Sequence, residues 1–139
     1  MTNSYERIEG FRFSAVSAGI KRADVHRLDF GLIVADVPAS AAALTTTNIV
    51  VAAPVTLTRE RLKKGLCRAV LVNSGNANAF TGEQGIRDAV MLTAEVSAAL
   101  HEDPNLVVPL STGVIGVPMP VERMKARIPS LINGLETGC

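Results

Sequence analysis

A buried strand that runs straight into a polar loop is the feature that most constrains how this chain can fold. Residues 68–72 are apolar after the first, and residues 73–82 then bring three Asn, two Gly, one Ser and one Thr. From Gln84 to about Glu102 apolar residues recur at helical spacing, at Ala89, Leu92, Val96 and Ala99. A strand, a tight loop and an amphipathic helix in succession predict an α/β fold in which helices pack on a sheet.

Further strands are expected on both sides of this unit. Between Leu28 and Ala35 apolar residues alternate with a weaker second face, which is the pattern of a strand covered on one side. Leu106 to Leu110 forms another buried strand, interrupted by Pro109. Two shorter strand candidates lie on either side of a polar run: Ala42 to Leu44 and Ile49 to Val55.

Two shorter helices are also expected. Thr58 is placed to cap a helix that runs to Lys64 and stops at Gly65. A last helix is marked by the apolar residues Val121, Met124, Ile128 and Leu131. Pro129 should kink or divide that helix, and the chain shows no evident element after it.

Composition favours one domain and excludes several functions. With 139 residues, 47% of them apolar, the chain can bury one core, and no repeat or linker divides residues 1–139, so we expect a single α/β domain. The formal charge is +1 and the basic residues are scattered, so no nucleic-acid partner is expected. No apolar run approaches the roughly 20 residues that cross a bilayer, and residues 1–10 are too polar for a signal peptide. We therefore expect a cytoplasmic protein with small-molecule partners.

The motifs of nucleotide and metal chemistry are mostly missing. The sequence has no Gly-x-x-x-x-Gly-Lys loop, no Gly-x-Gly-x-x-Gly, no Gly-x-Ser-x-Gly and no His-Glu-x-x-His. Cys67 and Cys139 lie far apart and are interpreted as thiols. His26 and His101 have charged neighbours but no second ligand at metal spacing. Solvated surface histidines are the better interpretation than catalytic or metal-binding ones, and no metal is expected.

Two polar segments remain as candidate sites. Asn73 to Gly82 offers many side-chain hydrogen bonds, but Asx-rich turns commonly bond only their own backbone. The second segment is Ser111-Thr112-Gly113, directly after an expected strand. There the hydroxyl of Thr112 and the unhindered N–H of Gly113 could stabilise a developing carbonyl oxyanion. A plain strand-to-helix turn explains the same spacing equally well.

Three stretches occur along the chain in a characteristic order. They are Gly19-Ile-Lys21 with Ala52-Ala-Pro-Val55, Asn73-Ser-Gly-Asn-Ala-Asn-Ala79 with Thr81-Gly82, and Ser111-Thr-Gly-Val-Ile-Gly116. Together they resemble the ornithine acetyltransferase (glutamate N-acetyltransferase) family, from about Gly10 to Met124. The resemblance implies the amino-terminal (alpha chain) part of such an enzyme. Its fold would be the layered sheets and helices of the self-cleaving ornithine acetyltransferase / DmpA-like fold, incomplete without the second chain.

The resemblance also implies a mechanism. In that family a precursor cleaves itself before a Thr, and the new terminal Thr takes the acetyl group of N2-acetyl-L-ornithine and passes it to L-glutamate through an acyl-enzyme, in arginine biosynthesis. Thr112 and Gly113 match the family's oxyanion hole. No cofactor is expected, although some members accept acetyl-CoA as donor. The implied partner is a beta chain with the nucleophilic Thr, in a heterotetramer of two alpha and two beta chains.

The chain also departs from the family's pattern. Phe80 stands where many relatives carry a small residue or Cys, and the spacing around Val117 to Pro120 differs from the commoner one. The sequence stops before the family's cleavage site, so the chain alone is expected to be inactive. Two alternatives stay open: an aminopeptidase-like hydrolase of the same self-cleaving fold, and a catalytically inactive structural fragment. For Asn73 to Gly82 we expect a supporting role in the active-site wall or the subunit core.

Overall fold

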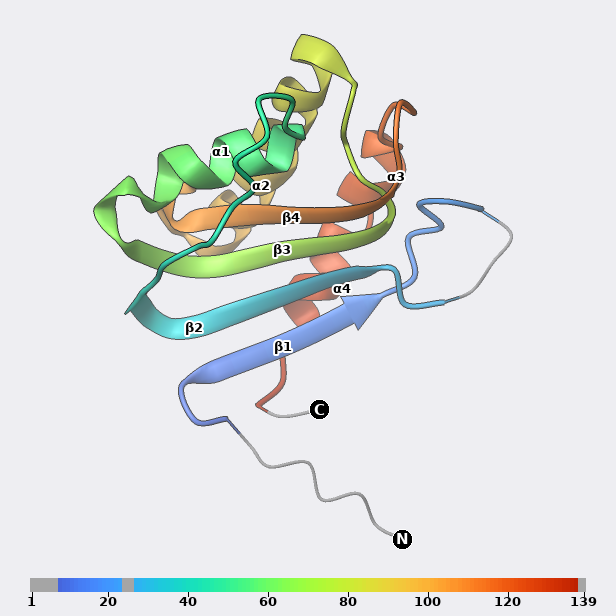
Figure 1. Ribbon diagram of the computed structural model, residues 1–139. Coiled ribbons are helices and arrows are strands. Elements are labelled where there is room, and N and C mark those ends of the chain that lie inside the picture. The colour runs from blue at the N-terminus through green and yellow to red at the C-terminus, as the bar shows by residue number, and fades with distance from the viewer. Residues whose placement is uncertain (1–7, 24–26, 138–139) are drawn as a thin grey trace, which may run out of the picture.

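The computed structural model describes residues 8–23 and 27–137, and these residues form helices around one four-stranded sheet (Figure 1). The strands are β1 (Phe11–Val16), β2 (Phe30–Ser40), β3 (Leu66–Asn76) and β4 (Val107–Val114). The helices are α1 (Ala53–Arg61), α2 (Gly82–Leu100), α3 (Val121–Lys125) and α4 (Ile128–Asn133), with short 3-10 turns η1 (Leu62–Lys64) and η2 (Pro104–Leu106). The predicted α/β class is confirmed.

The four strands lie in the sheet in the same order as in the chain. β1 pairs with β2 and β2 with β3 in antiparallel fashion, whereas β3 and β4 are parallel. A parallel pair needs a crossover, and α2 supplies it by leading from the end of β3 to the start of β4. The carboxyl ends of β3 and β4 therefore meet at one edge of the sheet.

Helices cover one face of the sheet and form the core with it. The strands contribute Phe30, Leu32, Val34, Ala69, Leu71 and Val107 to this core, and the helices contribute Leu92, Val96, Met124, Ile128 and Leu131. The helical periodicity predicted for residues 84–102 is confirmed by α2, whose Ala89, Leu92 and Val96 are buried. Ala99, expected on the same face, is exposed instead.

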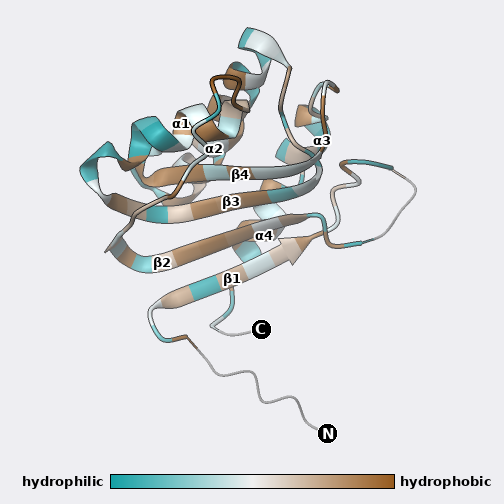
Figure 2. Ribbon diagram, in the orientation of Figure 1, coloured by the Kyte–Doolittle hydropathy of each residue, from teal (hydrophilic) through white to brown (hydrophobic). Residues whose placement is uncertain are grey.

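The opposite face of the sheet is apolar too, and most of it is half-buried or exposed; among the described residues α1, η1 and residues 39–43 border it near β4, where Val108 is buried. The strand register places Phe13, Ile33, Val70 and Val108 side by side across the sheet, and then Ala15, Gly31, Val72 and Leu110. Figure 1 views the sheet from this side, with α4 behind the strands, and Figure 2 shows apolar residues along β2, β3 and β4. We call this surface the open face.

Both edges of the sheet are closed by side chains or backbone. Along β4, the Thr58 hydroxyl donates to the carbonyl of Pro109 at 3.0 Å, and the guanidinium of Arg61 donates to the carbonyl of Val107. Along β1, the backbone of Phe13 exchanges two hydrogen bonds with Glu136, N to O at 2.9 and 3.1 Å. These contacts occupy groups that would otherwise attract a further strand at each edge. The bridge at Glu136 also gives the end of the chain an ordered contact that the sequence did not indicate.

The segment between β2 and α1 differs from the expectation. Residues 42–44 and 49–52 are not strands, because nothing in the described chain pairs with them and β-propensity alone does not hold a strand. α1 begins at Ala53, with Pro54 in the first turn, where its fixed φ and missing N–H suit a helix start. Thr58 is therefore not a cap but a buried residue inside α1. The stop at Gly65 is confirmed by its left-handed backbone, φ 66°.

Two further outcomes concern β1 and the last helix. β1 was not predicted, although Phe11, Phe13 and Ala15 alternate with polar residues there. The predicted helix at 121–131 is divided into α3 and α4, and Pro129 lies in the first turn of α4. Proline at that position begins a new helix without breaking a hydrogen bond, so the predicted division is confirmed.

Candidate active-site edge

Thr112 and Gly113 lie inside β4, not in a turn after it. Thr112 pairs with Ser74 and Gly113 with Gly75, so β3 and β4 stay together beyond the predicted strand ends. The predicted strand-to-helix turn at this position is wrong, because β4 continues through Val114 and the loop begins only there. The ladder becomes irregular at Asn76, which is opposite both Thr112 and Val114.

Two glycines allow the backbones of β3 and β4 to come unusually close. Gly113 has φ 135°, and a Cβ on it would lie 2.3 Å from the carbonyl carbon of Gly75 and 2.5 Å from the nitrogen of Asn76. No side chain fits at that distance. The conformation itself, far into positive φ, also favours glycine. Gly113 is thus required by the local backbone, and its amide is not shielded by a side chain of its own.

The hydroxyl of Thr112 is presented at the open face of the sheet. Side chains alternate along a strand, so Thr112 shares a side with Leu110, which is 48% exposed. Thr112 is exposed, and its hydroxyl makes no hydrogen bond to any residue that the structure describes. A hydroxyl and a glycine amide at the end of a parallel strand pair can donate to an oxyanion held against this edge. A nucleophile would have to approach from the open face.

Buried side chains of the segment Asn73 to Gly82 hold the carboxyl ends of β3 and β4 in place. Asn73 and Asn76 are buried, and the Ser111 hydroxyl donates to the side-chain oxygen of Asn73 at 2.6 Å. The side-chain amide of Asn76 donates to the carbonyls of Val117 and Pro118, at 3.0 and 3.2 Å. These bonds fix the strand before Thr112 and the loop after it. The segment is therefore not a turn that bonds only its own backbone.

Asn78 connects the same segment to α2. It is fully buried, and its amide donates to the carbonyl of Gly85 at 2.8 Å, while its oxygen accepts from the Thr81 hydroxyl at 2.8 Å. Gly85 leaves room for this contact, since a Cβ there would lie 2.4 Å from the oxygen of Asn78. Phe80, the departure from the family pattern, is 74% exposed with φ 56°. It does not enter this network.

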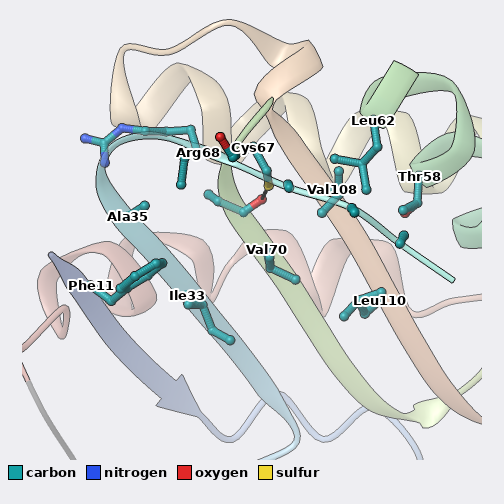
Figure 3. Close-up of a pocket in the computed structure, with 16 residues that line it drawn as sticks. Phe11, Ile33, Ala35, Thr58, Leu62, Cys67, Arg68, Val70, Val108 and Leu110 are labelled. Atoms are coloured by element: carbon teal, nitrogen blue, oxygen red, sulfur yellow. Dashed lines mark hydrogen bonds between the residues drawn. The ribbon is translucent and has the colours of Figure 1, made fainter. Parts of the chain in front are cut away.

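The open face contains a cavity of about 270 Å³ near the start of β3. Figure 3 shows Ile33, Val70 and Leu110 projecting toward it from three strands, and residues 39–43 border it. Its lining is almost entirely apolar. One exception is Arg68, whose Nε contacts Glu102 at 2.7 Å while Nη1 is buried without an acceptor among the described residues. The cavity offers binding volume but none of the chemistry of a reaction centre.

Neither Cys67 nor His101 is placed for catalysis. Burial raises the pKa of the Cys67 thiol, which keeps it protonated and unreactive, as its interpretation as a plain thiol requires. His101 is exposed at the end of α2, with φ 56°. His26 and Cys139 lie outside the described residues. Within the described ranges no group of three His, Cys, Asp or Glu could hold a metal ion, and no helix has the length and apolar character to span a membrane.

A basic cleft borders Gly75 on the side of β2, away from Gly113 and β4. The sequence did not lead us to expect it. It has a volume of about 240 Å³ and is lined by Lys21, Arg22, Arg27, Asp29, Ser74 and Gly75. Asp29 is buried, and each of its carboxylate oxygens accepts a backbone N–H at 2.7 Å, from Ala18 and from Ile20. An aspartate next to an apolar strand was the available signal, since a buried carboxylate must be hydrogen-bonded.

The family of this chain follows from its similarity to known proteins. The ArgJ family model matches residues 12–138, and the chain belongs to that family. Curated relatives named arginine biosynthesis bifunctional protein ArgJ include those of Geobacter sulfurreducens, 54% identical over 92% of this chain, and Thermosynechococcus vestitus, 43% identical over 99%. The chain spans 32% and 33% of the lengths of these two proteins.

Solved structures agree with this family. The crystal structure of arginine biosynthesis bifunctional protein argJ from Bacillus halodurans matches with a TM-score of 0.81 and 39% identity, over 91% of this chain and 68% of that one. Ornithine acetyltransferase from Mycobacterium tuberculosis, complexed with ornithine, matches with a TM-score of 0.86 and 38% identity, over 94% of this chain and 69% of that one. The resemblance noted in the sequence is confirmed.

Proposed function

We propose that this chain is the oxyanion-binding part of a glutamate N-acetyltransferase. The observation that carries this proposal is the position of Thr112 and Gly113 at the carboxyl end of β4, facing the open side of the sheet, in a chain of the ArgJ family. The complete enzyme would move the acetyl group of N2-acetyl-L-ornithine to L-glutamate in the cytoplasm. Acetyl-CoA is proposed as a second acetyl donor, and no resident cofactor takes part.

The proposed reaction has two steps. A Thr hydroxyl from outside this chain attacks the acetyl carbonyl carbon, its proton passes to the terminal amine of that Thr and then to the ornithine nitrogen, and ornithine leaves as the amine when the C–N bond breaks. The amine of glutamate then attacks the acyl carbon, the C–O bond to the Thr breaks, and the proton lost by that amine returns to the Thr oxygen. In both steps the carbonyl oxygen carries negative charge, and the Thr112 hydroxyl and the Gly113 N–H donate to it.

The nucleophile is proposed to come from a second, beta chain that covers the open face. An apolar face on both sides of strands such as β2 and β3 is typical of a sheet buried between two layers. The curated relatives are about three times as long as this chain, so they have the material for a second layer. We propose a heterotetramer of two alpha and two beta chains, in which this chain alone is inactive.

Substitution of Thr112 in the complete two-chain protein tests the role of the oxyanion donors. Thr112→Val keeps the shape and removes the hydroxyl, and kcat should fall by roughly 10²–10³, as is typical for the loss of one oxyanion donor. Thr56→Val, an exposed threonine on α1, is the matched control and should leave kcat unchanged. An unchanged kcat for Thr112→Val would contradict the assignment.

Product analysis distinguishes the alternatives. N-acetylglutamate formed from N-acetylornithine and glutamate supports transfer. Free acetate without N-acetylglutamate would support the aminopeptidase-like hydrolase. No turnover of either kind by the complete protein would leave only a structural role, and turnover by this chain alone would contradict its proposed inactivity.

A further inference from the structure

The basic cleft at the start of β2 and the end of β3 has the properties of a binding site for an anion. Lys21, Arg22 and Arg27 are exposed around a space of about 240 Å³. This space lies where β1 ends and β2 begins, and Figure 1 shows these two strand ends side by side. Among the described residues no carboxylate lies within ion-pair distance of Lys21 or Arg27. Two positive charges that have no acidic partner among the described residues thus face one cleft, and an anion bound there would pair with both.

Asp29, the acidic residue among the described residues that line the cleft, holds the backbone around it. Both carboxylate oxygens of Asp29 are engaged by the backbone N–H groups of Ala18 and Ile20, at 2.7 Å each. From the far side, the guanidinium of Arg123 donates to the carbonyl of Gly19 at 2.9 Å. The turn that leads into Lys21 is therefore held from two directions, and its position does not depend on a ligand.

The cleft lies next to the proposed oxyanion donors. A Cβ on Gly75 would lie 3.0 Å from both the nitrogen and the Cβ of Lys21, and a Cβ on Gly113 would lie 2.3 Å from the carbonyl carbon of Gly75. The backbone of Gly75 therefore contacts the backbone of Lys21 and also that of Gly113. Neighbouring strands are about 4.8 Å apart, so the cleft begins about one strand away from the amide of Gly113.

The acceptor glutamate carries an anion at a matching distance. In N-acetylglutamate five bonds separate the acetyl carbonyl carbon from the side-chain carboxyl carbon, which is roughly 6 Å when the side chain is extended. The side chain of the donor N-acetylornithine ends in an ammonium group instead, which two cations repel. A positively charged cleft one strand from the oxyanion therefore suits the acceptor and not the donor.

We propose that Lys21 and Arg27 bind the side-chain carboxylate of the acyl acceptor and thereby select glutamate. This inference rests on the proposed acetyl transfer. Lysine and arginine both form charge-assisted hydrogen bonds to a carboxylate, and the arginine fork can do so with two N–H groups. The residues act on binding of the second substrate, because formation of the acyl-enzyme does not involve glutamate.

The test is steady-state kinetics of the complete two-chain protein with Lys21→Met and Arg27→Met. The KM for glutamate should rise by roughly 10- to 100-fold in each variant, the effect expected for a hydrogen bond to a charged group. The KM for N-acetylornithine should stay within about twofold, which also reports that the variant has folded. Lys63→Met, an exposed lysine on η1, is the control and should change neither constant.

Replacing the acceptor gives a second readout that a merely structural role would not change. Glutamine has nearly the shape of glutamate but no side-chain charge, so the wild-type protein should prefer glutamate and the variants should lose most of that preference. A preference that persists in the variants overturns the proposal. An equal rise of KM for donor and acceptor also overturns it, because the cleft would then bind the α-carboxylate that both share. If the wild-type protein transfers no acetyl group, the proposed function itself has failed.

Discussion

The two faces of the sheet differ in what covers them, not in what they are made of. On the covered face Leu32 is 1% exposed beneath the helices, whereas on the open face its neighbour Ile33 is only half-buried and lines a cavity. Both residues are large and aliphatic. The hydrophobic pattern of β2 and β3 is therefore that of strands buried on both sides, although the described chain buries only one.

This difference separates the requirements of folding from those of assembly. The covered face stabilises this chain, since its side chains leave water when the helices dock. The open face contributes little to that stability and becomes important when a second layer is added. Thr112 stands on the open face, so the same surface would hold both the partner and the reacting groups.

The largest expected effect on the free energy of unfolding comes from a substitution on the covered face. Leu32→Ala should lower the free energy of unfolding of the chain by about 2–5 kcal/mol, because it leaves a cavity in a packed core. Ile33→Ala, one residue further along β2, should cost less than about 1 kcal/mol in the same chain. Urea denaturation followed by circular dichroism measures both. Equal losses would mean that the open face is packed in solution.

A charge on the open face should act on assembly. In a complex of this chain with the proposed beta chain, Val70→Asp should weaken association of the two chains by roughly 100-fold or more, since a buried unpaired charge costs several kcal/mol. Val90→Asp makes the same change at a position of α2 that is 40% exposed, and should leave the complex intact. Size-exclusion chromatography with mass analysis provides the comparison. A Val70→Asp complex as stable as the Val90→Asp complex would rule out the open face as the docking surface.

A buried amide on the helical side should have an intermediate effect. Asn78→Ala removes the bonds to Gly85 and Thr81 and should cost about 1–3 kcal/mol of unfolding free energy. Asn105→Ala, an exposed asparagine that only bonds Asp103, should cost less than about 0.5 kcal/mol. Thermal denaturation of the two variants side by side measures the difference. If Asn78→Ala lowers the free energy of unfolding no more than Asn105→Ala does, the hydrogen bonds of Asn78 do not support the strand ends at Thr112.

The smallest expected effect concerns Cys67, which lines the open-face cavity but is itself buried. Burial raises the pKa of its thiol in the folded chain above the ordinary value of a cysteine. Its contribution to stability is thus complete below pH 9 and decreases as the pH rises toward the folded-state pKa, because only the unfolded thiol ionises there. Cys67→Ala should remove this part of the pH dependence between pH 8 and 10.5 in urea titrations. Identical pH profiles for both proteins would show that solvent reaches the thiol.

Sequence patterns predicted the elements whose own residues determine them. The apolar run at 68–72 and the helical spacing of Ala89, Leu92 and Val96 became β3 and α2, since periodic burial is encoded locally. The strand candidates at 42–44 and 49–55 failed because a strand also needs a neighbour, and pairing is a property of the whole fold. β1 was missed although its alternation was visible, and the same signal in the next strand, β2, was used correctly.

The candidate site was only partly predictable. The chemistry of Thr112 and Gly113 was visible in the residue types, but their position within a strand depends on the pairing with Ser74 and Gly75, far away in the sequence. For the cleft at Lys21 the sequence offered only Asp29 next to an apolar strand, and the cleft itself forms only when the turn after β1 meets the end of β3. The pattern of residues in one sequence does not show which distant segments will contact each other.

The order of the strands has a consequence for biosynthesis. Each strand pairs with the one that precedes it in the chain, so the sheet can grow on the ribosome in step with translation, without waiting for a distant segment. A nascent chain of this kind would expose the apolar side of its finished sheet while the rest of a longer polypeptide is still being made. Chaperone binding to that side during translation is the expected result, and it should end when the second layer arrives.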